Sequence, residues 1–324
     1  MDLVETLKKK IIALEEGEYI PGLKAVLSHI ETAFRHLSRG QESDDDTAFT
    51  DAIYRTNQAF EGSVKEAYRV LAGQDPSRKR PYYIENYLEL NNVFRSRVLN
   101  QLTVYRTQWR NPSAHDYKLN FDESEAFLAI VSVSAFTCLL LDQIAERLAY
   151  TRSRAEAEAQ KAELAATLAE TINADLLVRV TELLTQFCAI HFPSSAESFG
   201  KPTEPQVIGA LHGFLASAAP ELIVQTEARL DSEKHFRADL LVTRGDERLV
   251  IELKRRLVRP SYMNAVAQIE QYLLIGGIQS GVLLFLPDGP GEMERSDSTV
   301  SSLDGRLVIL SPVGSNIKIQ RTGN

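Results

Sequence analysis

The sequence predicts an all-α bundle in residues 1–150, a helical linker in residues 151–192 and an α/β domain with a mixed sheet in residues 193–324. Three observations support this division. Apolar residues recur at three- and four-residue spacing up to about residue 186, which is typical of packed helices. Residues 151–171 are rich in Ala, Glu, Lys, Arg and Gln and contain no Gly or Pro. After residue 205 the apolar residues instead fall in runs of four to eight, which indicates strands.

Five helices are expected in the bundle, with Gly, Pro or acidic residues between them. Leu3, Leu7 and Ile11 form the apolar stripe of the first helix. Acidic residues at 122–125 suit the positive end of the dipole of the last helix. The expected helices cover residues 3–14, 23–37, the stretch from the 43–46 loop to residue 71, 82–109, and residue 123 onward.

The last of these helices is expected to continue into the linker. At about 1.5 Å per residue, a helix over 151–171 would act as a rod or as one strand of a thin coiled coil, paired between two chains. The α/β domain is expected to begin with a helix and then to alternate strands with one further helix. Helices are expected at 204–218 and 263–275, strands at 222–226, 238–243, 249–253, 281–286 and 307–310, and a mobile loop at 288–304.

Composition and charge exclude several classes of protein. The 324 residues suffice for two or three domains of ordinary size. With 36 Lys and Arg against 44 Asp and Glu, the net charge is -8, so any contact with nucleic acid must come from a local patch. Residues 1–199 carry 22 basic and 29 acidic side chains (22 − 29 = −7), and residues 200–324 carry 14 and 15.

Neither a disulfide framework nor a membrane span is expected. The two cysteines, Cys138 and Cys188, stand alone in apolar stretches without zinc-ligand spacing. The N-terminus has no secretory pattern, and the uncharged run at 126–141 is shorter than the ~20 residues that a spanning helix needs. A cytoplasmic protein without a membrane partner is therefore expected.

Two carboxylates and a lysine are expected to converge in the C-terminal domain. Asp239 lies on one predicted strand, and Glu252 and Lys254 lie on the next, after a Gly-Asp turn. The period of two places Glu252 and Lys254 on one face. Two carboxylates suit Mg²⁺ or Mn²⁺, and the lysine suits a phosphate or an attacking water. A solvated cross-strand pair is the alternative, but Asp239 and Glu252 interrupt the most apolar strands, where unpaired carboxylates are costly.

This arrangement resembles the PD-(D/E)XK nuclease superfamily over residues 204–286. In that resemblance Asp239 is the motif aspartate, Glu252 is the acidic residue and Lys254 is the lysine, while Ala238 stands where a proline is often found. The resemblance implies a restriction-endonuclease-like core and a Mg²⁺- or Mn²⁺-dependent endonuclease, with DNA as the favoured substrate.

Further residues match parts of the same resemblance. Glu204 matches an additional acidic metal or water ligand, although a helix-start acid explains it as well. Gln268 and Tyr272 match a Q-x-x-x-Y helix of one branch, or else form an amphipathic helix surface. A basic cluster after the lysine is a candidate phosphate contact, and a solvated strand end is its alternative: Arg255, Arg256 and Arg259.

A second constellation stands in the helical half. Arg110 and His115 are separated by four residues, Asn111 follows the arginine, and Pro112 marks a break between helices. A guanidinium can stabilise a phosphate while an imidazole moves a proton, so the pair suits metal-independent RNA cleavage through the 2′-hydroxyl. The alternative is that Arg110 pairs with an acid such as Asp116 and that His115 caps the last helix.

The segment resembles the R-x(4-6)-H signature of the HEPN family over residues 45–150. The resemblance implies either a metal-independent ribonuclease or a non-catalytic partner domain, and a homodimer in which two motifs line one cleft. A polar stripe on the third helix either faces that cleft or is a solvated face: Asn57, Glu61 and Lys65.

Three hypotheses therefore remain open. The chain is a two-nuclease protein of bacterial antiviral or toxin-like defence, as both resemblances imply. Alternatively, the helical half is a dimerisation or sensing module and only the C-terminal domain cuts. In the third, the chain is a nucleic-acid-binding regulatory scaffold with an inert nuclease core. An activating ligand or partner protein is compatible with all three.

Overall fold

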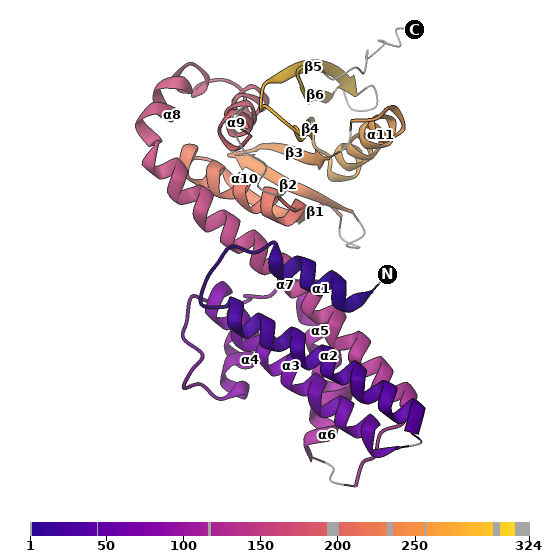
Figure 1. Ribbon diagram of the computed structural model, residues 1–324. Coiled ribbons are helices and arrows are strands. Elements are labelled where there is room, and N and C mark those ends of the chain that lie inside the picture. The colour runs from indigo at the N-terminus through magenta and orange to yellow at the C-terminus, as the bar shows by residue number, and fades with distance from the viewer. Residues whose placement is uncertain are drawn as a thin grey trace. The chain divides into compact units, whose positions relative to one another are not determined.

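The computed structural model describes residues 2–43, 45–115, 118–192, 201–231, 236–255, 257–300 and 305–314. The chain divides into two compact units, Met1–Leu148 and Ala149–Asn324. The first unit is helical and the second combines helices with a six-stranded sheet, so the predicted all-α and α/β halves are both present (Figure 1).

Unit 1 is a helical bundle around an aromatic core. The ring of Phe60 stacks on Tyr105 at 4.7 Å and lies 5.4 Å from Phe136. The elements are α1 (Leu3–Ile12), α2 (Ile20–Ser43), α3 (Thr47–Leu71), α4 (Pro81–Leu90), α5 (Ser96–Tyr105), a π-helical turn η1 (Arg106–Arg110), α6 (Asn111–His115) and α7 (Glu123–Ala159), which continues into unit 2.

The single helix expected over residues 82–109 is wrong, because the chain breaks between α4 and α5. Asn92 takes a left-handed conformation with φ 50°, which asparagine tolerates better than most residues and which a helix cannot contain. The break lets α5 and η1 run separately from α4. The apolar residues on both sides of Asn92 keep a helical spacing, and for this reason the sequence pattern did not indicate a break.

Unit 2 is built on one mixed sheet with the strand order β1-β2-β3-β4-β6-β5. The first three strands form an antiparallel meander, β4 runs parallel to β3 and to β6, and β5 pairs antiparallel with β6. The elements are α8 (Lys161–Thr167), the short helix η2 (Ala169–Thr171), α9 (Leu176–His191), α10 (Glu204–Ala218), β1 (Ile223–Arg229), β2 (Arg237–Arg244), β3 (Glu247–Lys254), α11 (Arg259–Gly276), β4 (Ser280–Phe285), β5 (Met293–Val300) and β6 (Gly305–Pro312).

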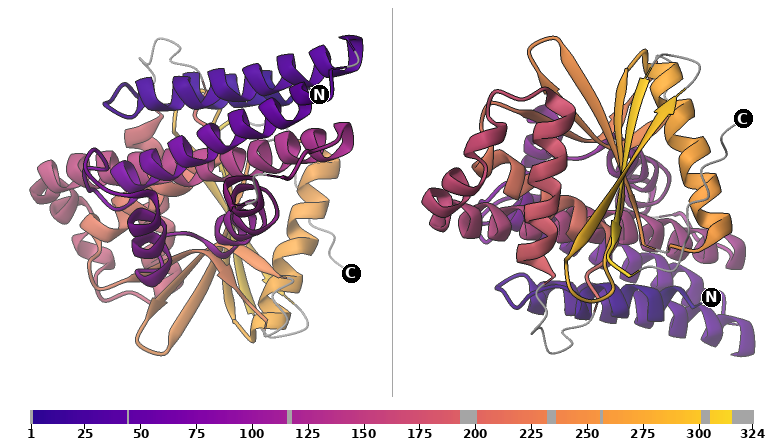
Figure 2. Two further views of the ribbon diagram at one scale, coloured as in Figure 1. Left: turned by 90° about the horizontal axis from the view of Figure 1, so that it is seen from below. Right: turned by 90° about the horizontal axis from the view of Figure 1, so that it is seen from above.

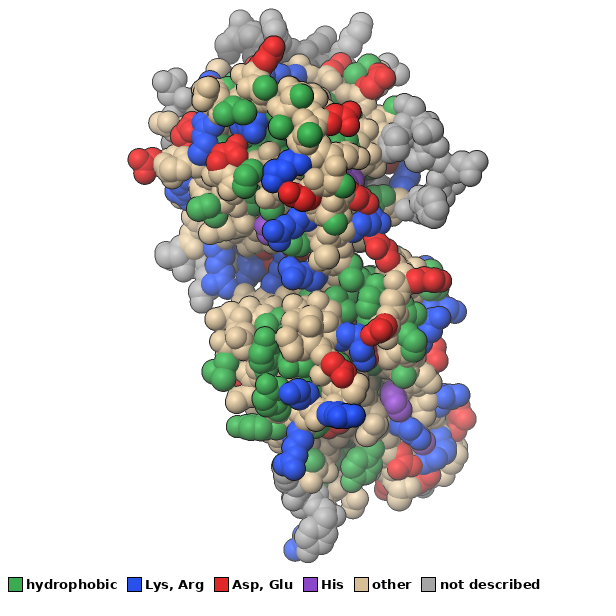
Figure 3. Space-filling model, turned by 90° about the vertical axis from the view of Figure 1, so that its left-hand side faces the viewer, with side chains coloured by type: hydrophobic (Ala, Val, Ile, Leu, Met, Phe, Trp, Pro, Cys, Tyr) green, Lys and Arg blue, Asp and Glu red, His purple; other side chains and the backbone are tan. Residues whose placement is uncertain are grey.

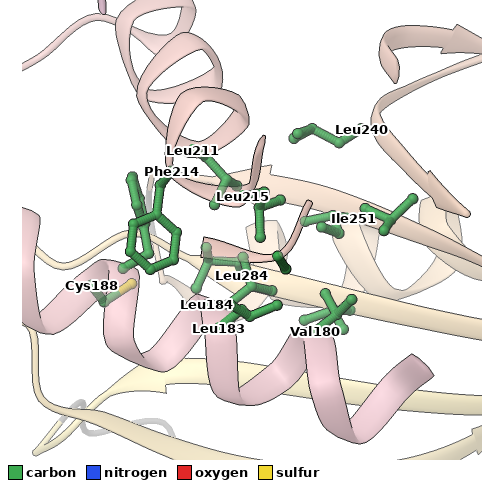
Figure 4. Packing of buried hydrophobic residues seen from close by; sticks show 14 of the residues in the cluster. Val180, Leu183, Leu184, Cys188, Leu211, Phe214, Leu215, Leu240, Ile251 and Leu284 are labelled. Carbon is green, nitrogen blue, oxygen red and sulfur yellow. The ribbon is translucent and has the colours of Figure 1, made fainter. Parts of the chain in front are cut away.

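Helices cover both faces of this sheet (Figure 2). On one face, Leu184 and Cys188 of α9 and Phe214 of α10 belong to the cluster that contains Leu240 and Ile251 of the sheet (Figure 4). On the other face, α11 packs on the alternate strand residues, whose side chains point away from α9 and α10. Both faces are apolar, which explains why the inner strands read as continuous apolar runs.

The linker expected over residues 151–192 is instead part of unit 2. The helix α7 ends at Ala159, and α9 lies on the sheet with Leu177, Leu184 and Phe187 buried. The mostly alanine stripe of 151–163 suggested a rod, but the strongly apolar sequence of α9 requires a partner surface, and the sheet supplies it.

The loop expected at 288–304 is also wrong in part, because β5 occupies Met293–Val300. This strand lies at the sheet edge and pairs only with β6, and its residues are mostly exposed and polar. An edge strand with polar side chains on both faces lacks the period-two signal that identifies a half-buried strand.

Among the described residues, α7 is the one helix long and apolar enough to cross a membrane by length and composition. Half of its most apolar segment is buried inside the protein, and a buried core helix passes the same test. Ile130, Val133 and Phe136 of this segment are fully buried in the bundle.

Candidate functional site

The two predicted carboxylates meet where β2 and β3 separate. The ladder between these strands reaches Leu240 and Ile251, so Asp239 and Glu252 are the next residues in the same register. Instead of a further backbone pair, the Leu253 amide donates a hydrogen bond to Asp239 Oδ2 at 2.7 Å. The strand β3 continues beside β4 alone, with Glu252 opposite Leu283. The tight turn at Gly245, with φ 59°, sets this register.

The site faces the layer that contains α11. Alternate residues of a strand lie on the same face of the sheet, so Asp239 is on the face of Leu241 and Glu252 is on the face of Val250. Leu241 and Val250 both pack in the apolar cluster that contains α11 residues. On that helix, Gln268 Nε2 donates a hydrogen bond to Tyr272 Oη at 2.6 Å. Burial raises the pKa of Tyr272, the Gln268 bond opposes this, and the Glu252 and Asp239 charges add to the rise.

Lys254 completes the predicted trio. Its Nζ donates a hydrogen bond to Glu252 Oε1 at 2.7 Å, and the lysine side chain keeps 24% of its surface exposed. Glu252 is only 3% exposed, and its second oxygen, Oε2, has no hydrogen-bond partner among the described residues. One buried carboxylate oxygen is therefore available to an additional positive or donor group.

The electrostatics of the site favour the binding of a cation. Burial and the neighbouring Glu252 carboxylate raise the pKa of Asp239 to about 7, and Glu204 adds to the rise. The bond from Leu253 and the Lys254 charge oppose it. Burial also raises the pKa of Glu252, against the opposing bond from Lys254. Glu204, the first residue of α10, is thus close enough to repel both carboxylates.

The donor set of the site fits a hard divalent cation that shares its ligands with a substrate. In the described ranges, no three His, Cys, Asp or Glu side chains form a group that could hold a metal ion. Asp239 and Glu252 supply two carboxylates, and one oxygen of Glu252 has no hydrogen-bond partner within the ranges that the structure describes. Mg²⁺ is usually bound through one or two carboxylates together with waters and substrate phosphates, so two carboxylates suffice for it.

The predicted basic cluster is only partly described. The Arg255 guanidinium donates a hydrogen bond to the carbonyl of Pro202, so it is already engaged within unit 2. Arg256 lies outside the described residues. Arg259 begins α11, and its side chain also lies outside the described part of the chain. A phosphate-binding role for this cluster stays a prediction.

In unit 1, Arg110 ends the π-helical turn η1 and lies against α3. Its Nη2 is 3.8 Å from Glu61 Oε1, and its Nη1 donates to Asn111 Oδ1 at 3.0 Å. His115 ends α6, but its side chain lies outside the described residues, as does the whole of Asp116. Arg110 therefore has Glu61 as an acidic neighbour, which the sequence had placed on the polar stripe of the third helix.

A buried hydrogen-bond network holds the motif on α3. Tyr105 Oη donates to Thr56 Oγ1 at 2.7 Å and also lies 2.9 Å from Asn57 Oδ1. Asn57 Nδ2 then donates to Ser113 Oγ at 2.8 Å. Asn57 and Glu61 thus face the motif. Sequence reasoning missed Tyr105 and Ser113, because these contacts join residues 48 and 56 positions apart.

Comparisons with protein-family models, with curated proteins and with solved structures found no match to this chain.

Proposed function

We propose that this protein is a metal-dependent phosphodiesterase, and that its site contains Asp239, Glu252 and Lys254. The observation that carries the proposal is the buried Glu252 carboxylate, which lies beside a second carboxylate and has one oxygen without a partner in the described part of the chain. A carboxylate pair of this kind is costly to bury unless a cation joins it. The lysine on the same face adds a cationic group that can stabilise the negative charge on a phosphate.

Each residue has a distinct role in this proposal. Asp239 and Glu252 would hold Mg²⁺ or Mn²⁺, and Glu204 would contribute through a water or as an additional ligand. The ion would polarise the scissile phosphate and lower the pKa of a bound water. Lys254 donates hydrogen bonds to the phosphate or the attacking water and stabilises negative charge. Gln268 and Tyr272, bonded to each other, line the α11 side of the site.

The order of elements in unit 2 supports a restriction-endonuclease-like core. The sequence helix, three antiparallel strands, helix and parallel strand corresponds to α10, β1 to β3, α11 and β4. That order agrees with the PD-(D/E)XK resemblance of residues 204–286. DNA is the favoured substrate under that resemblance. The PD-(D/E)XK and HEPN resemblances together imply a role in bacterial antiviral or toxin-like defence, and the cysteine usage and N-terminal sequence favour the cytoplasm.

A substrate panel tests this proposal. The purified protein is incubated with plasmid DNA and with total RNA, each with Mg²⁺, Mn²⁺ or EDTA. We expect loss of intact DNA with either metal and none in EDTA. If a preparation that binds Mn²⁺ cuts neither nucleic acid, the nuclease proposal fails and the regulatory scaffold replaces it, unless an activating ligand restores cleavage.

A second activity is favoured by the surroundings of Arg110. Its guanidinium is held by Glu61 and Asn111 at a π-helical turn, and such turns are frequent at functional sites. We propose that Arg110, Asn111 and His115 cleave RNA without metal, in a homodimer that brings two such motifs together. RNA cleavage in EDTA by the parent protein that disappears in His115→Ala supports this second activity. If the parent protein cleaves no RNA in EDTA, the helical unit is a dimerisation or sensing module instead.

A further inference from the structure

The loop between α3 and α4 (Figure 1) leads into a basic and aromatic surface at residues 78–83 of unit 1. Three cationic side chains occur in succession at its end, and two tyrosines follow in the first turn of α4. Tyr82 is 75% exposed and Tyr83 is 48% exposed. All three cations are exposed as well. We call this the 78–83 surface: Arg78, Lys79, Arg80, Tyr82 and Tyr83.

Local bonds fix the backbone of this surface. The Asp75 carboxylate accepts hydrogen bonds from the Ser77 amide at 2.9 Å and from the Ser77 hydroxyl at 2.6 Å. The Lys79 amide donates to the carbonyl of the buried Pro76 at 3.1 Å. Pro81 then starts α4 with a backbone dihedral already suited to a helix. The charged side chains therefore project from an ordered turn, and binding would require little ordering of the backbone.

The charges on this surface are largely uncompensated within the protein. Lys79 Nζ lies 4.8 Å from the centre of the Tyr83 ring. In the described part of the chain, neither Lys79 nor Arg80 has an acidic partner in an ion pair, whereas the charge of Arg78, like that of Arg69, acts on Asp75. On the face drawn in Figure 3, both units carry acidic, basic and hydrophobic side chains. Three adjacent cations, of which Arg78 alone has Asp75 as an acidic neighbour, are a local exception in an acidic half.

Cations beside exposed aromatic rings suit a single-stranded nucleic acid. The cations pair with successive phosphates, and the tyrosine rings stack on bases that a duplex would keep stacked on each other. An arginine or lysine over a ring adds a further attraction. We propose that the 78–83 surface binds single-stranded nucleic acid.

The position of α4 relates this surface to the Arg110 motif. Glu85 lies one helical turn after Tyr82, and its carboxylate is 3.4 Å from Arg106 Nη1. The Arg110 charge also acts on Glu85 and partly offsets the effect of burial on its pKa. Tyr82 therefore lies one helical turn along α4 from Glu85, a carboxylate on which the Arg110 charge acts. The binding does not depend on either proposed cleavage activity.

Fluorescence anisotropy on the full chain in EDTA tests the proposal. The probes are labelled 2′-O-methyl RNA, which lacks the reactive hydroxyl, single-stranded DNA, duplex DNA, and vesicles with anionic lipid. The variants are the triple substitution Arg78→Ala/Lys79→Ala/Arg80→Ala and the single substitution Tyr82→Ala. The controls remove three positive charges or one tyrosine ring elsewhere on unit 1. They are Lys8→Ala/Lys9→Ala/Lys24→Ala and Tyr54→Ala, all at exposed positions.

The triple variant should bind single-stranded nucleic acid at least about tenfold more weakly. Because it should release roughly two fewer counterions on binding, the slope of log binding constant against log salt concentration should be shallower than for the parent. Tyr82→Ala should weaken single-strand binding roughly five- to a hundredfold and duplex binding little. The controls should stay within about twofold of the parent. The two single-stranded probes decide between RNA and DNA. Equal losses in the triple variant and its control, or a loss confined to anionic vesicles, would overturn the proposal. Circular dichroism confirms that each variant is folded.

Discussion

At Asp239 and Glu252 the chain buries negative charge that the described protein neutralises only in part. Lys254 satisfies one oxygen of Glu252, and the Leu253 amide satisfies one oxygen of Asp239. Among the described residues the remaining Glu252 oxygen is buried without a partner, which costs about 1–3 kcal/mol for an ordinary polar group. Function explains such a cost better than stability does, because binding of a cation would remove it.

The pKa of Asp239 makes stability depend on pH in a defined window. Burial and Glu252 raise this pKa to about 7, against an ordinary 3.8. Between these values the folded protein holds a proton that the unfolded chain has lost, so the free energy of unfolding falls as pH rises from about 4 to about 7. Asp239→Asn removes this titration and keeps an acceptor for Leu253. In EDTA it should stabilise the protein on the order of 2 kcal/mol more at pH 8 than at pH 4.

Urea unfolding of parent and variant at both pH values measures this difference. Because Asp239 and Glu252 titrate as an interacting pair, the transition should be broad. A stability difference that is the same at pH 4 and pH 8 would show that the Asp239 carboxylate is ionised throughout this range in the folded state.

Lys254 is expected to act on the phosphate or the water rather than in holding the ion. In Lys254→Met, Mn²⁺ should still raise the melting temperature, while the rate of DNA cleavage should fall by about 10²–10⁴. Lys201→Met, at a side chain 70% exposed, is the matched control and should keep the parent rate. Parent-like cleavage by Lys254→Met would remove the lysine from the mechanism.

At the scale of elements, close packing of α10 on α7 fixes part of unit 2. A Cβ on Gly213 would lie 2.2 Å from the Tyr150 carbonyl oxygen, and this backbone cannot move independently of α7. Helix propensity alone favours alanine by about 1 kcal/mol. We expect the clash to dominate, so that Gly213→Ala destabilises the protein by about 1–3 kcal/mol.

Thermal unfolding of Gly213→Ala beside Gly62→Ala checks this prediction. In Gly62→Ala the new methyl meets only the side chain of Val26, which can adjust, and so the loss should be smaller. A melting temperature for Gly213→Ala at or above that of the parent would mean that the two helices separate easily.

The elements that the sequence predicted well are those with an apolar face. The inner strands β2, β3 and β4 lie within a few residues of their predicted ranges, because each is buried on both faces. The polar edge strand β5 and the break at Asn92 carried no such signal. The convergence of Asp239 with Glu252 followed from a local hairpin, whereas the Tyr105 and Ser113 network joins distant segments and had no local pattern.

At the scale of the whole molecule, the two candidate sites lie in separate compact units. Arg110→Ala should therefore leave metal-dependent DNA cleavage unchanged, and Glu252→Gln should leave any RNA cleavage in EDTA unchanged. Both assays are run on both variants of the full chain. If either variant loses both activities while remaining folded, the two units work as one enzyme and not as two independent sites.

Cleavage of supercoiled plasmid by the parent and by Glu252→Gln tests the central claim most directly. Exposed Glu163 supplies the control variant Glu163→Gln. The parent and the control should nick the plasmid with Mg²⁺ or Mn²⁺ and not in EDTA, and Glu252→Gln should lose about 10²-fold or more in rate. A Glu252→Gln protein that cuts as fast as the parent would contradict the assignment of this carboxylate pair as the metal-dependent site.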